Sequence, residues 1–147
     1  MCKETQLETA RPTIFLNLLD NDQRTEFFRA AAFLAAVDGV DERETARIEQ
    51  ARLECGLPKS VTDVGASLDD VVGAMSKIES VAARNAMALE LAGILVADDE
   101  HSAEEKVAFA AIASALGIGE HHAARAIELA TSWQQLADDS TDYLSEA

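Results

Sequence analysis

The chain has 147 residues, a formal net charge of −15 and a sequence pI near 4.4. A chain of this length can form one compact domain with a substantial core. The strong negative charge argues against DNA, RNA or an anionic membrane surface as the main partner, because neutralising phosphates requires lysine and arginine. It is compatible with cations, with basic partners, or with solubility alone.

Alanine supplies much of the hydrophobic content, and aromatic residues make up only 5% of the chain. Alanine favours helices more than any other residue and lets neighbouring helices approach closely. Only Pro12 and Pro58 could interrupt a helix. No segment alternates apolar and polar residues as a half-buried strand does. The sequence therefore predicts an all-α fold, a compact bundle of about seven helices.

The cysteines and the N-terminus favour a reducing cytoplasm as the location of the chain. Cys2 and Cys55 are too few for a disulfide framework, and Cys55 occupies a position where we expect a small buried residue. Residues 1–4 lack the basic-then-apolar order of a signal peptide. The most apolar stretch, residues 91–97, is far too short to span a bilayer.

The first third of the chain predicts a lead-in and two helices. We expect residues 1–12 to form a loose polar lead-in, and residues 13–19 to form a short apolar docking helix. Acid and amide side chains at residues 20–22 can cap a helix that runs to about Val37, where Gly39 ends it. We assign four residues to its inward face: Phe27, Ala31, Leu34 and Ala35.

The next helix begins at Asp41, and Glu44 at the third helical position completes a pattern that resembles a capping box. It ends at Gly56, a normal residue after the C-terminus of a helix. We assign three residues to its inward face: Ile48, Ala51 and Cys55. A connector over residues 58–67 follows, and Ser67 at its end can cap a short helix.

Three further helices are predicted in the second half. A long helix spans roughly residues 80–97, and Ser102 with Glu105 forms a Ser-x-x-Glu capping box for the next helix, which ends at Gly117. A final helix runs from about Glu120 to Leu136. The predicted inward residues of the long helix and its successor are Ala83, Met87, Leu91, Ile94, Leu95, Phe109, Ile112 and Leu116.

The domain is predicted to span residues 13–137 and to end in an acidic tail over residues 138–147. We expect the start of this tail to fray, with Tyr143 and Leu144 available to pack back onto the bundle. We interpret Trp133 and Tyr143 as residues that cover the end of the bundle rather than bind a ligand.

The sequence contains an internal similarity that predicts a duplication. A shift of sixty positions places residues 32–38 on residues 92–98, and beyond the loop the shift becomes sixty-one. Apolar positions, acids and terminating glycines then correspond. The matched pairs are Glu44 with Glu105, Ile48 with Phe109, Ala51 with Ile112, and Gly56 with Gly117. Two helix pairs around a pseudo-two-fold axis would bury both sets of apolar residues.

Residues 35–44, Ala-Ala-Val-Asp-Gly-Val-Asp-Glu-Arg-Glu, resemble the signature of the TerB-like tellurite-resistance domains, in which a helix ends in Ala-Asp-Gly and Glu opens the next helix. Residues 95–105 resemble a second copy, although Asp99 replaces the expected glycine and the loop is longer. The resemblance covers roughly residues 25–129. It implies an all-helical bundle of about seven or eight helices that serves tellurite and chemical-stress responses as a metal-sensing or scaffolding module.

Two acidic clusters are the candidate metal sites. The first contains Asp38, Asp41 and Glu44, and the second contains Asp98, Asp99 and Glu105. Ca²⁺ and Mg²⁺ prefer such carboxylate oxygens, but neither loop has the spacing of an EF-hand. Capping is the alternative role, worth about 1 kcal/mol for each cap. Asp38 and Asp98 are the better candidates, because each follows a helix C-terminus, where the helix dipole disfavours an acid.

Histidines offer a weaker possibility. His101 follows Asp98 in an Asp-x-x-His pair that would admit Zn²⁺, but the first copy has no histidine. We interpret His121 and His122 as part of a solvated first helical turn. If a single site binds an ion, we favour the second loop, because it also carries Asp99, Glu100 and His101.

The sequence contains no Gly-x-Ser-x-Gly, His-Glu-x-x-His, phosphate-binding glycine loop or Cys-x-x-Cys motif. It therefore predicts a non-enzymatic TerB-like stress-response module that acts through protein contacts, in a membrane-associated assembly, and that responds to a divalent cation such as Ca²⁺. The alternative is a metal-free structural or oligomeric interaction subunit. A metal-dependent hydrolase is a remote third hypothesis.

Overall fold

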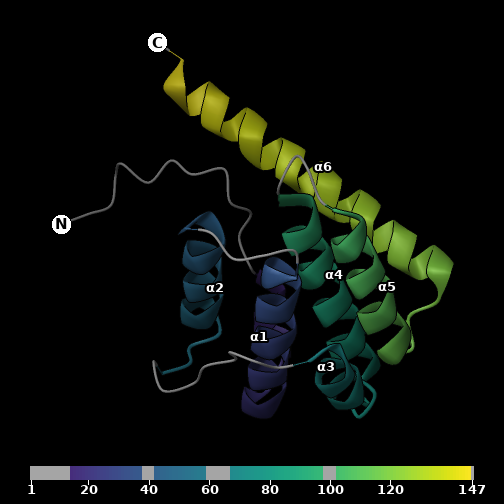
Figure 1. The fold of residues 1–147 in the computed structure, drawn as a ribbon. Helices are drawn as coiled ribbons and strands as arrows, with labels where there is room; N and C mark the ends of the chain where they lie inside the picture. Colours follow the sequence, from purple (N-terminus) through teal and green to yellow (C-terminus); the bar gives the residue numbers. More distant parts are fainter. Residues whose placement is uncertain (1–13, 38–41, 59–66, 98–101, 147) are drawn as a thin grey trace.

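The computed structural model describes residues 14–37, 42–58, 67–97 and 102–146 (Figure 1). These residues form six α-helices and one 3₁₀ helix, and none of them lies in a strand, which confirms the all-α prediction. The elements in chain order are η1 (Ile14–Leu18), α1 (Asn21–Ala36), α2 (Glu42–Glu54), α3 (Leu68–Met75), α4 (Val81–Ala97), α5 (Ala103–Ala115) and α6 (Glu120–Ser145).

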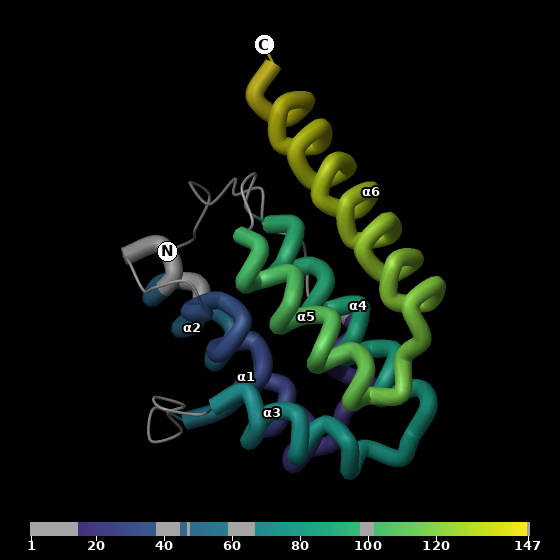
Figure 2. Tube along the Cα trace, turned by 45° about the vertical axis from the view of Figure 1, so that its right-hand side comes forward, coloured from purple at the N-terminus to yellow at the C-terminus, as the bar shows by residue number. Residues whose placement is uncertain are grey.

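Helix α4 lies at the centre of the bundle. It packs against η1, α1, α5 and α6, while α3 packs against α1 and α5, and α2 packs against α1 (Figure 2). Nine of its 17 residues are buried, and most of these have small side chains. Small side chains let the backbones of several helices approach α4 at once. Among the described residues, no helix is both long and apolar enough to cross a membrane.

The inward faces predicted from periodicity are largely confirmed. All four residues assigned to α1 are buried, as are the inward residues predicted for α5. In α4 only Ile94 is partly exposed, and in α2 Cys55 is buried while Ile48 and Ala51 are partly buried. The largest fully buried apolar side chains are Leu34, Met75, Met87, Leu91, Leu95, Ile112 and Leu116.

Among the helices whose preceding residue the structure describes, α1, α3 and α5 open with capping boxes. The Oδ1 atom of Asp20 accepts a bond from the backbone N–H of Gln23 at 2.8 Å, and the Gln23 side chain accepts one from the backbone N–H of Asp20 at 2.9 Å. Ser67 and Asp70 form the same reciprocal pair at α3. Each box satisfies donors that the first turn of a helix leaves without intrahelical partners.

Helices α2 and α5 both end in a Schellman motif built on a glycine. Gly56 has a φ of 71° and Gly117 has a φ of 76°, in the left-handed region that favours glycine. In α2 the N–H of Leu57 donates to the Arg52 carbonyl at 3.1 Å, and the N–H of Gly56 donates to the Leu53 carbonyl at 3.0 Å. The two corresponding bonds in α5 are both 2.9 Å.

The predicted end of the last helix is wrong. Helix α6 continues to Ser145 and does not fray after Leu136. The glutamines one turn earlier donate to the aspartates, Gln134 to Asp138 at 3.1 Å and Gln135 to Asp139 at 3.0 Å. No glycine or proline follows in residues 137–146, so nothing in this segment stops the helix.

The C-terminal part of α6, coloured yellow, extends beyond the ends of α4 and α5 in both views (Figures 1 and 2). We call this part of the helix the overhang. Tyr143 and Leu144 do not pack back onto the bundle, since 74% and 63% of their surfaces are exposed. Four other predicted features lie outside the described residues. They are the lead-in over residues 1–12, the stop at Gly39, the helix start at Asp41, and residues 59–66 of the connector.

The Schellman glycines lead to a matched pair of predictions. We expect Gly56→Ala to lower the free energy of unfolding by about 1 kcal/mol, because alanine is strained at positive φ. Gly73→Ala, inside α3, should raise it by about 0.5 kcal/mol, since an added Cβ there meets no atom within 4 Å. Urea unfolding of the two variants measures both changes. Equal changes of the same sign would contradict the assigned end of α2.

Candidate functional site

Most of the predicted cation ligands fall outside the part of the chain that the structure describes. This holds for Asp38, Asp41, Asp98 and Asp99, and for His101. Glu44 lies in α2, but its side chain also falls outside that part. Among the described residues, no group of three or more histidine, cysteine, aspartate or glutamate side chains is arranged to hold a metal ion.

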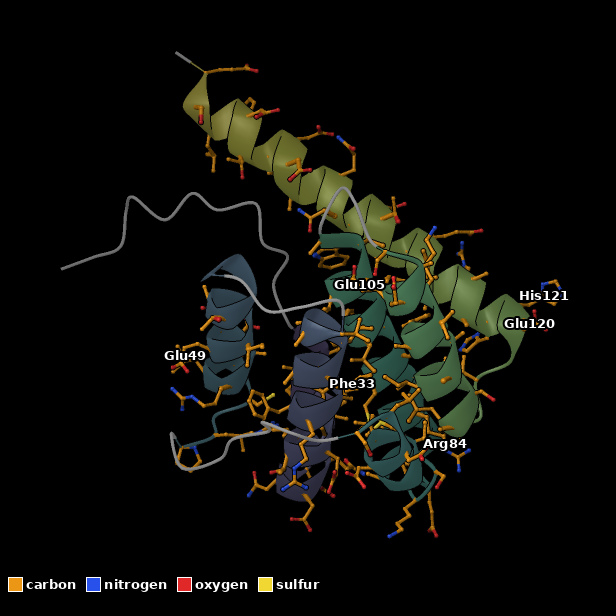
Figure 3. The ribbon with its side chains drawn as sticks, in the orientation of Figure 1. Phe33, Glu49, Arg84, Glu105, Glu120 and His121 are labelled. Carbon is orange, nitrogen blue, oxygen red and sulfur yellow. The ribbon has the colours of Figure 1, made fainter. Side chains whose placement is uncertain are left out.

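Glu105 is the one predicted ligand whose surroundings are described. Only 3% of its surface is exposed, in the first turn of α5 (Figure 3). Its Oε1 atom accepts a bond from the backbone N–H of Ser102 at 3.0 Å, and the Ser102 hydroxyl accepts one from the backbone N–H of Glu105 at 3.1 Å. The predicted capping box is thus confirmed, and one oxygen of this carboxylate already has a structural role.

The histidine pair lies at the opposite end of α5, where α6 begins. Both side chains are exposed, and His121 points away from the bundle (Figure 3). The Nε2 atom of His122 lies 3.1 Å from Oδ1 of Asn85 on α4. These positions agree with the interpretation of a solvated first turn.

Cys55 lies in the core, as predicted, with 3% of its surface exposed. Burial, followed by the nearby Glu54 carboxylate, raises the pKa of its thiol to about 12. The thiol is therefore protonated at neutral pH and is not activated as a nucleophile.

An apolar groove of about 290 Å³ lies between η1, α4 and α6. The rings of Phe15 and Trp133 meet there edge to face, with centroids 6.1 Å apart and an angle of 65° between their planes. The lining contains two residues with polar side-chain groups, the hydroxyl of Ser132 and the indole N–H of Trp133. The lining residues are Phe15, Leu89, Leu129, Ala130, Ser132, Trp133 and Leu136. The sequence did not reveal this groove, because its three segments lie at least 40 positions apart along the chain.

The groove continues into a row of apolar side chains on α6, which we call the apolar stripe. Helical spacing places its members on one face, at positions i, i+4, i+7 and i+14. The stripe consists of Leu129, Trp133, Leu136 and Tyr143. Trp133 covers the bundle through its contact with Phe15, as predicted, but Tyr143 does not, since it is 74% exposed. Leu136 is 62% exposed. The seven-residue spacing was the available sequence signal for this surface.

Glu90 of α4 and Arg24 of α1 both bond to the backbone of η1, and the Glu90 bond positions Phe15 against α4. Only 1% of the Glu90 surface is exposed, and its Oε2 atom accepts a bond from the backbone N–H of Phe15 at 3.2 Å. The Nε atom of Arg24 donates to the Leu16 carbonyl at 3.1 Å. The sequence analysis missed Glu90, although it is the only acidic residue of α4 and the only polar one in residues 86–97. That isolation was the signal that could have found it.

No family model, curated protein or solved structure matches this chain. The resemblance of residues 35–44 and 95–105 to TerB-like domains therefore depends on those residues alone. The function of the groove and the stripe has to be inferred from their own geometry.

The contact between Glu90 and η1 predicts a measurable change at Trp133, the only tryptophan in the chain. We expect Glu90→Ala to lower the free energy of unfolding by about 2 kcal/mol, because the Phe15 N–H loses a charged acceptor. Release of η1 should also increase quenching of Trp133 fluorescence by acrylamide. Glu90→Gln keeps an acceptor oxygen and should show smaller changes. Unchanged quenching in Glu90→Ala would contradict this role.

Cation binding by the acidic loops stays a prediction. We expect Ca²⁺ at a hundredfold excess over its dissociation constant to raise the free energy of unfolding by about 2.7 kcal/mol. The melting temperature should rise accordingly. The double variant Asp38→Asn/Asp98→Asn should lose this gain. As a control, Asp69→Asn/Asp139→Asn removes two exposed acids, on α3 and α6, and should keep the gain. A melting temperature that no divalent cation changes would contradict the prediction.

Proposed function

We propose that this chain is a non-enzymatic helical module that binds another protein through the groove and the apolar stripe. The observation that carries the proposal is the exposure of apolar side chains on α6: Leu136, which lines the groove, is 62% exposed, and Tyr143, near the C-terminal end of the helix, is 74% exposed. Full burial of one large apolar side chain contributes about 1.5–3 kcal/mol. A partner that covered both Leu136 and Tyr143 would therefore bind with a substantial favourable contribution to the binding free energy.

The chemistry of the groove favours a protein partner over a small molecule. Small-molecule sites combine an apolar lining with several convergent polar groups that fix the orientation of the ligand. Here the side chains of the lining offer no charged group, and only the Ser132 hydroxyl and the Trp133 indole N–H are polar. The groove instead opens onto an exposed helical face, so a segment with several apolar side chains could contact both at once. An aromatic anchor such as Trp133 is also common at the centre of protein interfaces.

We further propose that the fold is a TerB-like duplication in which α1 and α2 correspond to α4 and α5. Both α2 and α5 contain 13 residues, and α1 and α4 contain 16 and 17. The matching Schellman motifs of α2 and α5 support the same relation. On this basis the chain would serve as a stress-response module of the tellurite-resistance type.

The two halves of the proposed duplication differ at the groove. Glu90 and Leu89 of α4 correspond to Ala30 and Arg29 of α1. Ala30 has no side-chain acceptor for an N–H group, and Arg29 is exposed and pairs with Glu26 at 3.4 Å. The first half therefore lacks both a carboxylate that could bond to η1, as Glu90 does, and an apolar side chain in the position of Leu89, which lines the groove. The binding surface is expected on the second half only.

A pull-down with matched variants tests the proposed function. Full-length protein is used as bait in a lysate of the source cells, alongside Leu129→Gln/Leu136→Gln. Glutamine keeps the helix propensity and the charge while removing the apolar surface. Leu53→Gln/Val107→Gln alters two exposed apolar residues on α2 and α5 and is the control.

We expect at least one protein that the wild-type chain and the control retain and that the α6 variant loses. Identical sets of bound proteins for all three baits would contradict the proposal. Sedimentation velocity of the same variants tests the alternative of a metal-free oligomeric subunit. That alternative requires self-association that depends on concentration.

A further inference from the structure

We infer that the partner of this surface is a basic amphipathic helix. Its apolar side chains would lie on the apolar stripe, with one of them in the groove, and its lysine or arginine side chains would lie beside the acids of α6. The inference depends on the proposed function, because it specifies the chemistry of the partner at the same surface.

The charge of α6 indicates that the partner carries positive charge. Arg125 is the last basic residue of the chain, and residues 126–146 contain only acidic charges. These are Glu128, Asp138, Asp139, Asp142 and Glu146. Glu128 pairs with Arg125 at 3.4 Å, and Asp138 and Asp139 accept bonds from neutral glutamine amides. The overhang therefore carries negative charge that no basic side chain of α6 neutralises.

The acids border the apolar stripe directly. Within α6, Asp139 follows Leu136 by three residues and precedes Tyr143 by four, and Glu146, the C-cap directly after the helix, follows Tyr143 by three. Residues three or four positions apart are neighbours on a helix surface. Asp139 and Glu146 are both exposed. A helix lying on the stripe would place its flanking positions within reach of both carboxylates.

The spacing of the stripe favours a helix as the docked element. Leu129, Leu136 and Tyr143 recur every seven residues, the repeat that keeps apolar residues on the seam between two packed helices. The stripe extends over about 21 Å at 1.5 Å per residue. The groove at its Leu129 end has room for a large apolar side chain of the partner, next to Trp133.

A second copy of this chain is the less suitable occupant. Two overhangs packed side by side would bring acids against acids, and like charges that face each other destabilise a helix pair. The chain as a whole carries a net charge of −15, so other faces of a second copy are also acidic on average. A lysine- or arginine-rich helix gains from the same charges.

Synthetic peptides without tryptophan test the inference. The first has leucine at helical spacing and lysine elsewhere, and the second has the same composition in scrambled order. The third peptide has glutamine in place of lysine, and the fourth has glutamate in place of lysine. Binding is followed through Trp133, whose emission should move to shorter wavelength when an apolar face covers it. We expect the leucine–lysine peptide to bind at least about tenfold more tightly than each of the others, a difference of about 1.4 kcal/mol.

Variants of the full-length protein separate the charge from the apolar surface. Asp139→Asn/Glu146→Gln should weaken binding of the leucine–lysine peptide about fivefold, as expected for two exposed charge pairs. The same double variant should leave the affinity for the leucine–glutamine peptide unchanged. Leu136→Gln should weaken binding of both peptides, while Leu53→Gln on α2 should weaken neither. Added salt should reduce the advantage of the lysine peptide.

The outcomes distinguish this inference from the proposed function. Equal affinity for the lysine and glutamine peptides, with loss of both in Leu136→Gln, would overturn the basic partner and leave the binding surface intact. Binding that Leu136→Gln does not change would overturn both. Self-association that Leu136→Gln abolishes would assign the surface to a second copy and overturn the inference in favour of an oligomer.

Discussion

The structure depends on α4, a helix that is buried on nearly every side. It contacts η1, α1, α5 and α6, and five of its nine buried residues are alanine or glycine. Small side chains allow four neighbours to pack closely around one axis, at the density typical of protein interiors. A larger residue at Ala92 would separate these helices or force them to shift. The alanine-rich composition is therefore a packing requirement as well as a helical preference.

Glu90 is the exception within α4, and the groove follows from it. A buried carboxylate needs donors, because an unpaired charge in the interior is strongly destabilising. One of these donors is the backbone N–H of Phe15. This bond holds η1 on α4 and sets the ring of Phe15 against Trp133. A polar residue in the core thus contributes to where an apolar surface forms at the edge of the bundle, together with Arg24, which bonds to the Leu16 carbonyl of η1.

The helices could be predicted from the sequence because their ends depend on local chemistry. Ser67 and Ser102 open helices, and Gly56 and Gly117 close them, as the sequence indicated. The length of α6 was missed because its aspartates suggested fraying, whereas glutamines one turn earlier bond to two of them. The groove could not be predicted, because the meeting of η1 with α6 depends on tertiary packing around α4. The acidic loops at residues 38–41 and 98–101 lie outside the described residues, and their role as cation ligands stays a prediction.

The exposed stripe follows from the way α6 docks. Its buried residues are Ala126 and Ala130, in its first half, whereas Leu129, Leu136 and Tyr143 of the stripe are exposed. At 1.5 Å per residue, α6 is about 39 Å long and α4 about 26 Å, which leaves an overhang. This overhang exposes apolar surface and concentrates like charges, both of which are unfavourable in water. A basic amphipathic helix would relieve both costs in one contact, whereas an acidic or neutral partner would relieve only the first.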